Sequence, residues 1–409
     1  MSAPRPFFAG EGRHALHVPE YGLVFEVDRL RRDRHELWGE LTVRADLAGA
    51  ATVRGILNAS DFNLSSARAR QDRARLLAQR SAAADLDWFG YLEELCLSVL
   101  DAERAGTPIV WLPEVAQPTA EDVLRFAGFA LPRHHAGILF GDGGAMKSLL
   151  ALWLAGMLTR AGLTVLFCDW ELTDAEHRVR LDALFGDDLP RIGYQRCERP
   201  LTVEVDGLRR RVREDGIDYL VLDSIAVGCA GAPESAEVAA DFMRALRQVG
   251  VGALCLAHVS KAEDGDKKPF GSGFWHNLAR ATWHIRRSEP TADERLVELC
   301  VTPRKNNLGP VGSPFAFRVT FDEGRTSFRT IDAASVEDFA PRLPLWQRIR
   351  ATLRKEGPLT LAALADELDA KVDSIEKAVK RQDQTFTRVT GPDGVFRVAL
   401  LDPAHRRTA

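Results

Sequence analysis

HAGILFGDGGAMKS, residues 135 to 148, is the stretch that decides the fold of this chain. It begins with an apolar run, 136–140, of the length typical of a buried strand. A glycine-rich turn follows, and Lys147 and Ser148 then begin a helix. The backbone N–H groups of such a turn and the positive end of the helix dipole favour a bound phosphate group. The stretch therefore predicts a strand, a phosphate-binding loop and a helix.

The same stretch predicts the ligands of a nucleoside triphosphate and its metal. Lys147 is placed to contact the β- and γ-phosphates, and Ser148 to give its hydroxyl to Mg²⁺. The pattern GxxxxGK[ST] fits except at Met146, where glycine would permit a backbone conformation that a long side chain resists. On the loop alone, an ordinary glycine-rich turn is the alternative. The predicted residues around ATP are Gly141, Asp142, Gly143, Gly144, Ala145, Met146, Lys147 and Ser148.

Length and composition indicate a soluble globular protein of two or three domains. The chain has 409 residues, of which 45% are apolar and 27% charged. The net charge is −4, so contact with nucleic acid would require a local basic surface. The chain contains no apolar run long enough for a bilayer and no signal-peptide core near its start, which predicts a cytoplasmic protein without a membrane partner.

The six cysteines show no CxxC pair and no histidine spacing suited to zinc. Three of them, Cys168, Cys255 and Cys300, fall in strand-like apolar runs. We therefore expect reduced, mostly buried thiols.

After the loop, strand and helix patterns alternate, which is typical of a parallel sheet with crossover helices. The expected strands are 164–168, 218–222 and 253–257. The expected helices are 149–160 and 235–248, with another between them that begins at a capping box of Thr173 and Glu176. These three strands lead into polar residues, among them Glu171, Asp223 and His258.

Ligands of parallel sheets bind beyond the carboxyl ends of the strands, so these three side chains should face one site. Asp223 is suited to orient Mg²⁺, and Glu171 is suited to act as the general base toward an attacking water. His258 is placed to sense the γ-phosphate. Taken singly, the three residues could instead be a helix cap, a surface acid and an ordinary strand-end histidine.

Residues 133 to about 332 resemble the RecA-fold ATPases, specifically the RepA-like and DnaB-like branch of plasmid and phage replicative hexameric helicases. The resemblance covers about half of the chain. It rests on GDGGAMKS (141–148), VLFCDWE (165–171), YLVLDS (219–224) and LCLAHVSK (254–261).

The resemblance implies a homohexamer with ATP bound between subunits and Glu171 as the catalytic base. It also implies a DNA-contacting loop at 261–273, with Lys261, Lys267 and Lys268. In that family a cation reaches the γ-phosphate from the neighbouring subunit, near a Gly-Pro turn. Lys305 is the first candidate here and Arg304 the second, while Asn307 stands where the pattern has another cation.

Patterns outside the core predict two flanking domains, and the chain as a whole is expected to be α/β. The predicted divisions are a small N-terminal α+β unit (1–113), a linker with a helix at 120–129 (114–132), the RecA-like core (133–332), a second linker (333–344) and a winged helix-turn-helix domain (345–402). In the first division, alternating residues at 21–28 and 36–44 predict a β-hairpin, and 65–83 and 86–105 predict helices. The arginines of 65–83 could contact nucleic acid or a neighbouring subunit, or form a solvated face.

The C-terminal pattern has three helices, 345–355, 361–368 and 372–381, and a hairpin, 385–400. A winged helix-turn-helix would place its third helix in the major groove of DNA. The available cations are Lys371, Lys377, Lys380, Arg381, Arg388 and Arg397. Five nearby acids dilute this basic face, so docking to another protein is the alternative.

The sequence therefore predicts an ATP-hydrolysing motor that acts on DNA as a helicase or translocase. The alternatives are a nucleotide-switched DNA-binding regulator and an ATPase that loads or remodels a protein partner.

Overall fold

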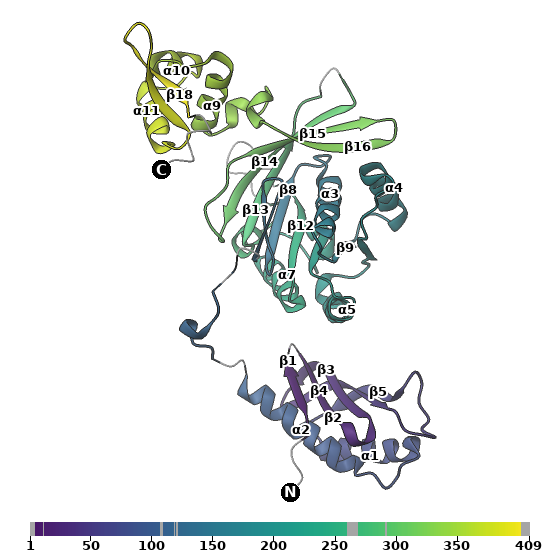
Figure 1. Cartoon of the computed structure of the whole chain (residues 1–409). Coiled ribbons are helices and arrows are strands. Elements are labelled where there is room, and N and C mark those ends of the chain that lie inside the picture. The colour runs from purple at the N-terminus through teal and green to yellow at the C-terminus, as the bar shows by residue number, and fades with distance from the viewer. Residues whose placement is uncertain are drawn as a thin grey trace. The chain divides into compact units, whose positions relative to one another are not determined.

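The computed structural model divides the chain into two compact units, Met1–Gln117 and Pro118–Ala409 (Figure 1). It describes residues 5–10, 12–106, 109–117, 119, 122–259, 269–290 and 293–401. In these ranges no helix has the length and apolar character needed to cross a membrane.

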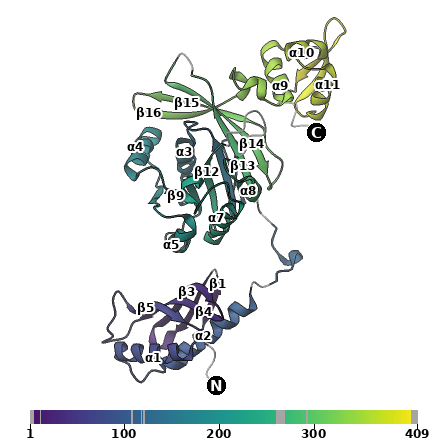
Figure 2. The same cartoon turned by 180° about the vertical axis from the view of Figure 1, so that it is seen from behind.

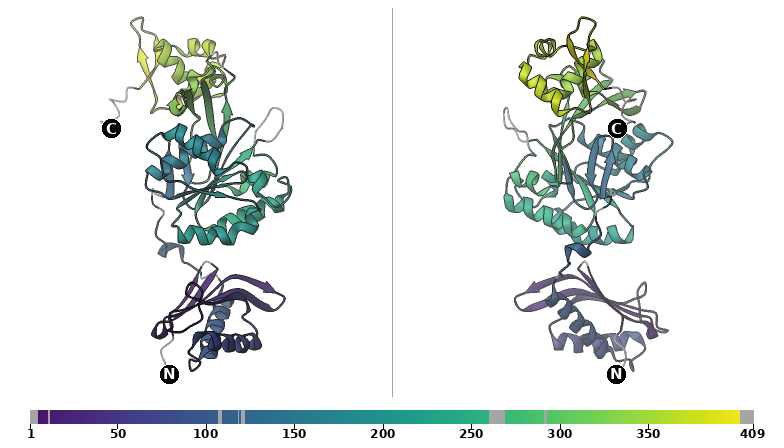
Figure 3. Two further views of the ribbon diagram at one scale, coloured as in Figure 1. Left: turned by 90° about the vertical axis from the view of Figure 1, so that its right-hand side faces the viewer. Right: turned by 60° about the vertical axis from the view of Figure 1, so that its left-hand side comes forward.

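The first unit is an antiparallel sheet with two helices on one face (Figure 3). Side chains that alternate along the strands, such as Phe25 and Leu41, share one buried cluster with Leu77, Leu92 and Leu95 of the helices. The predicted hairpin and both predicted helices are therefore confirmed. The elements are β1 (Phe7–Gly10), β2 (Arg13–Val18), η1 (Pro19–Tyr21), β3 (Leu23–Asp33), β4 (Glu36–Ala45), β5 (Ile56–Asn63), α1 (Ala67–Ser81) and α2 (Trp88–Ala105).

The arginines of α1 bind groups of their own unit. Arg70 donates to the carbonyl of Leu64 and pairs with Glu93, and Arg80 donates to the carbonyl of Ala51. Arg73 donates to Asn58 and lies over the ring of Phe62. These contacts favour a structural role for the arginines over nucleic-acid contact.

The second unit contains a nine-stranded sheet in the order β10-β9-β11-β12-β8-β13-β14-β15-β16. The first six strands of this order run parallel, and β14 to β16 are antiparallel additions. The strands are β8 (Ala136–Gly141), β9 (Val165–Asp169), β10 (Gly193–Arg196), β11 (Tyr219–Asp223), β12 (Gly252–His258), β13 (Ala281–Arg287), β14 (Leu296–Asn306), β15 (Phe315–Asp322) and β16 (Arg325–Ile331).

Helices cover both faces of this sheet (Figure 2). Apolar residues of α3 and α4 pack on one face, and those of α5 to α8 pack on the other. Both faces of the central strands are therefore buried, which explains their continuous apolar runs. The helices are α3 (Lys147–Arg160), α4 (Asp174–Phe185), α5 (Leu201–Glu214), α6 (Ile225–Gly228), α7 (Ala236–Val249) and α8 (Gly273–Leu278).

The predicted helix at 120–129 is wrong. The described part of this segment forms a hairpin of β6 (Val123–Phe126) and β7 (Phe129–Pro132), which follows the short turn η2 (Leu112–Glu114). Ala127 and Gly128 both have positive φ angles, 46° and 94°, as a two-residue hairpin turn requires. Phe129 is buried against Trp283 and Phe315, so the predicted linker partly belongs to the core of the second unit.

The chain after the sheet passes through η4 (Ala333–Ser335) and η5 (Ala340–Arg342) to a small group of elements with its own apolar cluster around Ile349, Leu364 and Ile375. The three helices and the hairpin expected there are present. They are α9 (Leu345–Glu356), α10 (Leu361–Glu367), α11 (Val372–Arg381), β17 (Phe386–Thr390) and β18 (Phe396–Leu400).

Candidate functional site

At the start of the loop after β8, the backbone runs close to the neighbouring strand, as the glycines there predict. Gly141 ends the strand and pairs in register with Ile285 of β13. A Cβ atom added at Gly141 would lie 2.4 Å from the carbonyl oxygen of Ile285, so only glycine fits without a backbone shift. The loop then turns at Gly144, whose φ angle is +75°, and α3 begins at Lys147.

Met146 adopts the left-handed conformation in which glycine is usual. Its φ and ψ angles are 61° and 28°, and it occupies the N-cap position of α3. This conformation costs a residue with a side chain about 1–2 kcal/mol. The side chain of Met146 packs against the apolar cluster on the α3 face of the sheet, and this burial offsets the cost. Methionine therefore replaces the glycine of the motif, but the backbone at the start of α3 keeps the left-handed conformation that glycine would adopt there.

Lys147 folds back over the loop. Its Nζ donates hydrogen bonds to the carbonyl oxygens of Gly141 (3.0 Å) and Asp142 (2.9 Å). Burial lowers the pKa of Lys147, while the charges of Asp223, Glu171 and Asp142 act in the opposite direction. The ammonium group thus lies within the electrostatic reach of two of the predicted strand-end acids.

Asp223 and Ser148 form the second part of the site. Asp223 ends β11, is 3% exposed, and forms a hydrogen bond with the Ser148 side chain. Among the described residues, its Oδ2 atom has no hydrogen-bond partner. Burial raises the pKa of Asp223 to about 6, and the charges of Asp169 and Glu171 add to this effect. A buried carboxylate with an unpaired oxygen beside a hydroxyl is a suitable oxygen pair for Mg²⁺.

Glu171 lies in the turn that follows β9, next to the end of β11. Its Oε1 atom accepts a hydrogen bond of 2.5 Å from the hydroxyl of Ser224. Asp169, the last residue of β9, pairs in register with Asp223. Asp169 is fully buried and lies 2.6 Å from Nε2 of His177 in α4.

Asp169, Ser224 and His177 are site residues that the sequence did not predict as such. The signal for Asp169 and Ser224 was their place at the ends of β9 and β11. No local sequence pattern marks His177. Its partner Asp169 is eight residues earlier, at the end of β9, and the two side chains meet only because of the turn between β9 and α4.

His258 ends β12 and pairs in register with Gly141, so it lies at the same edge of the sheet as the loop. Its side chain is exposed, and its carbonyl oxygen accepts a hydrogen bond of 2.7 Å from the N–H of Phe270. The predicted DNA loop follows, and its lysines Lys261, Lys267 and Lys268 lie outside the described residues.

Lys305 and Arg304 are not brought to the loop of their own chain. Lys305 lies on β14 opposite Thr282, which is level with Ile138 of β8, whereas Gly141 is level with Ile285. Measured along the strands, Lys305 therefore lies three residues, or about 10 Å, from the level of Gly141, where the loop begins. The Nζ atom of Lys305 donates to the carbonyl oxygens of His276 (3.0 Å) and Asn277 (2.7 Å) in α8.

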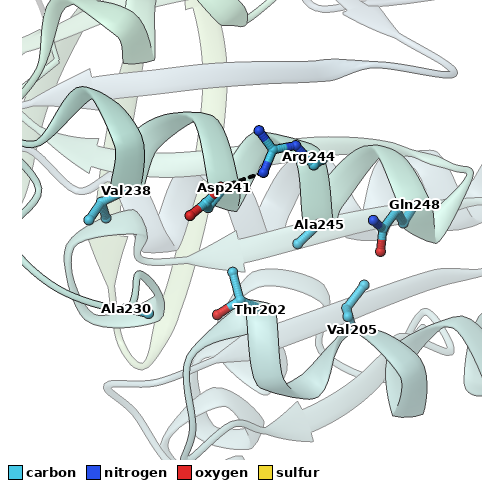
Figure 4. A pocket seen from close by; sticks show the side chains of 8 residues that line it. All are labelled: Thr202, Val205, Ala230, Val238, Asp241, Arg244, Ala245 and Gln248. Carbon is cyan, nitrogen blue, oxygen red and sulfur yellow. Dashed lines mark hydrogen bonds and ion pairs between the residues drawn. The ribbon is translucent and has the colours of Figure 1, made fainter. Parts of the chain in front are cut away.

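A cavity of about 290 Å³ lies between α5 and α7, away from these residues (Figure 4). On α7, Arg244 and Asp241 form an ion pair of 2.5 Å at its border. The cavity is lined by Thr202, Val205, Ala230, Val238, Asp241, Arg244, Ala245 and Gln248, and none of these is a predicted site residue.

Residues 114–264 match the family described as an AAA domain. This range contains the phosphate loop, Glu171, Asp223 and His258. No protein of curated function matches the chain. The match agrees with the parallel strand order and with the loop after β8, so this part of the second unit is similar to AAA domains in sequence and contains a mostly parallel sheet that ends in a P-loop-like turn.

Many solved structures, among them the following two, are similar to parts of the chain. One is the structure of an ATPase domain, with 16% identity, 47% of this chain and 84% of that chain covered, and a TM-score of 0.39. The other is the flagellar accessory protein FlaH from Methanocaldococcus jannaschii, with 15% identity, 50% and 92% covered, and a TM-score of 0.38. At these scores neither similarity carries an argument about function.

Proposed function

We propose that the protein is an ATP-hydrolysing motor that acts on DNA as a homo-oligomer, with ATP bound between subunits. The observation that carries the hydrolysis is the convergence of Lys147, Ser148, Asp223 and Glu171 at one edge of the sheet. These residues supply a cation, a hydroxyl and two carboxylates next to a helix N-terminus, which is the set that phosphoryl transfer to water requires.

ATP places its phosphates along the loop, and Lys147 exchanges its two carbonyl contacts for phosphate oxygens. Glu171 accepts a proton from the attacking water, whose oxygen bonds to the γ-phosphorus. The bond from the γ-phosphorus to the bridging oxygen breaks, and ADP leaves. Ser224 orients Glu171 through its hydrogen bond to Oε1.

Ser148 and Asp223 would hold Mg²⁺, together with phosphate oxygens and water. Mg²⁺ prefers oxygen ligands and usually keeps several waters, so one carboxylate and one hydroxyl are sufficient protein ligands. Among the described residues no cluster of three or more acids, histidines or cysteines is arranged to bind a metal by itself, and this magnesium site needs none. When bound, the ion neutralises charge that develops on the phosphates.

A second subunit supplies the remaining cation in this proposal. Lys305 and Arg304 lie about three residues back from the loop end of the sheet, so their own chain does not use them at its own loop. In a ring, which we take to be the hexamer of the resembled helicases, Lys305 or Arg304 contacts the γ-phosphate of the neighbouring site, where a cation stabilises the transition state. DNA then contacts the loop at 261–273 and the C-terminal domain, which we infer to be a winged helix.

The test is ATP turnover with and without single-stranded DNA. A motor is expected to show a large stimulation by DNA, and Lys147→Ala is expected to abolish nucleotide binding. Turnover without stimulation, together with selective binding to duplex DNA, would instead support a nucleotide-switched regulator.

One observation favours the second candidate, an ATPase that loads or remodels a protein partner. Two of the six cations of the expected DNA-binding face are paired within the chain, Arg388 with Glu376 and Arg397 with Asp393. Phe396 on the same hairpin is 69% exposed. Paired charges and an exposed aromatic ring are better suited to protein docking than to phosphate contact. Tight binding of a protein with no response to DNA would support this candidate.

A further inference from the structure

The turn that carries Glu171 is fixed by one buried carboxylate. Oδ1 of Asp169 accepts hydrogen bonds from the backbone N–H groups of Glu171 (2.5 Å) and Leu172 (2.8 Å). The N–H of Trp170 donates to the carbonyl oxygen of Asp223 at 2.8 Å. Three consecutive amides are therefore held, and the Cα position of Glu171 follows from them.

The other oxygen of this carboxylate belongs to His177. Nε2 of His177 lies 2.6 Å from Oδ2 of Asp169, and the two residues are 6% and 0% exposed. The imidazole ring packs against the rings of Phe167 (4.6 Å between centroids) and Tyr194 (5.5 Å). The hydroxyl of Tyr194 donates to the carbonyl oxygen of Leu172 at 2.7 Å, so Tyr194 contacts both the imidazole of His177 and the turn that carries Glu171.

The position of His177 is itself fixed by the start of α4. Thr173 caps the helix, and Glu176 bonds back to Thr173 in a complete capping box. His177 lies in the first turn after this cap, so the cap fixes its backbone, while contact of the ring with Phe167 and Tyr194 restricts rotation of the imidazole away from Asp169.

Burial alone would raise the pKa of Asp169, but the hydrogen bonds from His177, Leu172 and Glu171 outweigh burial and lower it. The carboxylate therefore stays charged and accepts all three donors. Without the imidazole, Oδ2 would be a buried charged oxygen with no donor, an arrangement that favours rotation of the carboxylate toward another partner. Rotation would also break the bonds of Oδ1 to the two amides.

We propose that His177 is a positioning residue for Glu171, acting through Asp169. The imidazole holds the carboxylate of Asp169 in the one orientation that fixes the backbone of Glu171 and Leu172. This inference rests on the proposed role of Glu171 in hydrolysis. The proposal also couples the start of α4 to the site. A shift of this helix end would move His177 and Asp169, and with them the backbone of Glu171, whose carboxylate polarises water.

Three substitutions at His177 separate the donor from the ring. His177→Ala removes both, His177→Phe keeps a ring against Phe167 and Tyr194 without a donor, and His177→Gln keeps a donor without the ring. Arg178→Ala is the matched control, because Arg178 is exposed on the same helix and forms its ion pair with Asp182, one turn further along α4.

Two readouts are measured. In ATP turnover, His177→Ala and His177→Phe are expected to lose about 10- to 100-fold in kcat, as small misplacement of a reacting group does. Their affinity for ATP is expected to stay within about twofold, and His177→Gln is expected to recover much of kcat. In hydrogen exchange, the amides of Glu171 and Leu172 are expected to exchange about tenfold faster in the Ala and Phe variants than in the Gln variant.

A double-mutant cycle decides whether the effect passes through Glu171. In a Glu171→Gln background, the substitutions at His177 are expected to cause no further loss of turnover. An equal loss in both backgrounds, or unchanged exchange of the two amides in His177→Phe, would overturn the proposal. If the wild-type protein hydrolyses no ATP, the proposed function fails, and the exchange comparison still decides whether His177 holds this turn.

Discussion

The loop edge of the large sheet and the part of β14 around Lys305 both carry a half-buried lysine that donates to two carbonyl oxygens, but the loop edge also holds a buried acid with an oxygen left unpaired by the described residues. At the loop edge, the raised pKa of Asp223 and its unpaired Oδ2 show that the site holds charge at a cost. Lys305 donates to two carbonyl oxygens at the end of α8, where a cation is favoured by the helix dipole. Burial lowers the pKa of both lysines, so the feature that distinguishes the loop edge is the unpaired oxygen of Asp223, which indicates a site shaped for an added ligand.

The largest expected effect on the chemical step at the loop edge is that of Glu171→Gln. The amide keeps the shape of the side chain and cannot accept the proton of water, so kcat should fall by roughly 10²–10⁴-fold. The affinity for ATP with Mg²⁺ should be unchanged, as measured by titration with a fluorescent nucleotide. Glu198→Gln, at an exposed position, is the control. Equal loss of nucleotide binding would show that Glu171 serves binding and not the chemical step.

At the other region, Lys305→Ala should reduce turnover about 10³-fold if the cation acts on a neighbouring site. Mixing this variant with Lys147→Ala should restore part of the activity, because an interface can then combine an intact Lys147 with an intact Lys305. Arg304→Ala is tested in the same way, and the exposed Lys355→Ala is the control. A mixture as inactive as its parts would refute action across an interface.

The charge held at the loop edge predicts a pH-dependent stability. The pKa of Asp223 is about 6 in the fold against 3.8 for an ordinary aspartate, so the native state binds the proton more tightly than the unfolded state. The free energy of unfolding therefore falls as the pH rises from about 4 to 6, by about 3 kcal/mol.

Asp223→Asn should remove this loss. In the absence of nucleotide it should stabilise the protein at pH 8 and have little effect at pH 4, as measured by urea unfolding. Asp187→Asn, at an exposed position, is the control. A gain of equal size at both pH values would mean that burial of the charge is not its cause.

The smallest effect is expected at Met146. Met146→Gly relieves the left-handed strain but loses apolar burial and makes the unfolded chain more flexible, so stability should change by less than about 1 kcal/mol. Nucleotide affinity should stay within about threefold. Met146→Val should be clearly less stable, because a branched side chain resists this conformation. A valine variant as stable as the wild type would show that the helix entry differs from the one described.

Much of the fold could be predicted because the pattern is local. The strands that end near Asp169, Asp223 and His258 lie in apolar runs bounded by polar residues, and the capping box of α4 is visible in four letters of sequence. The hairpin β6–β7 was missed because its apolar residues also fit a helical period, and the turn at Ala127 and Gly128 was overlooked. The edge strand β10 was missed because a four-residue polar strand has almost no periodic signal. Helix α5 does have a helical pattern, with Leu201, Val205 and Leu208 buried, and it was overlooked.

The sequence by itself determined the phosphate loop, the order of the strand ends and the identities of Lys147, Ser148, Glu171 and Asp223, because each depends on neighbours within a few residues. Only the tertiary structure decided the conformation of Met146, the pairing of Asp169 with His177 and the distance of Lys305 from the loop. The position of Lys305 depends on the register of distant strands. The other two features depend on how side chains pack against other elements, and the pattern of a short run of residues does not specify that packing.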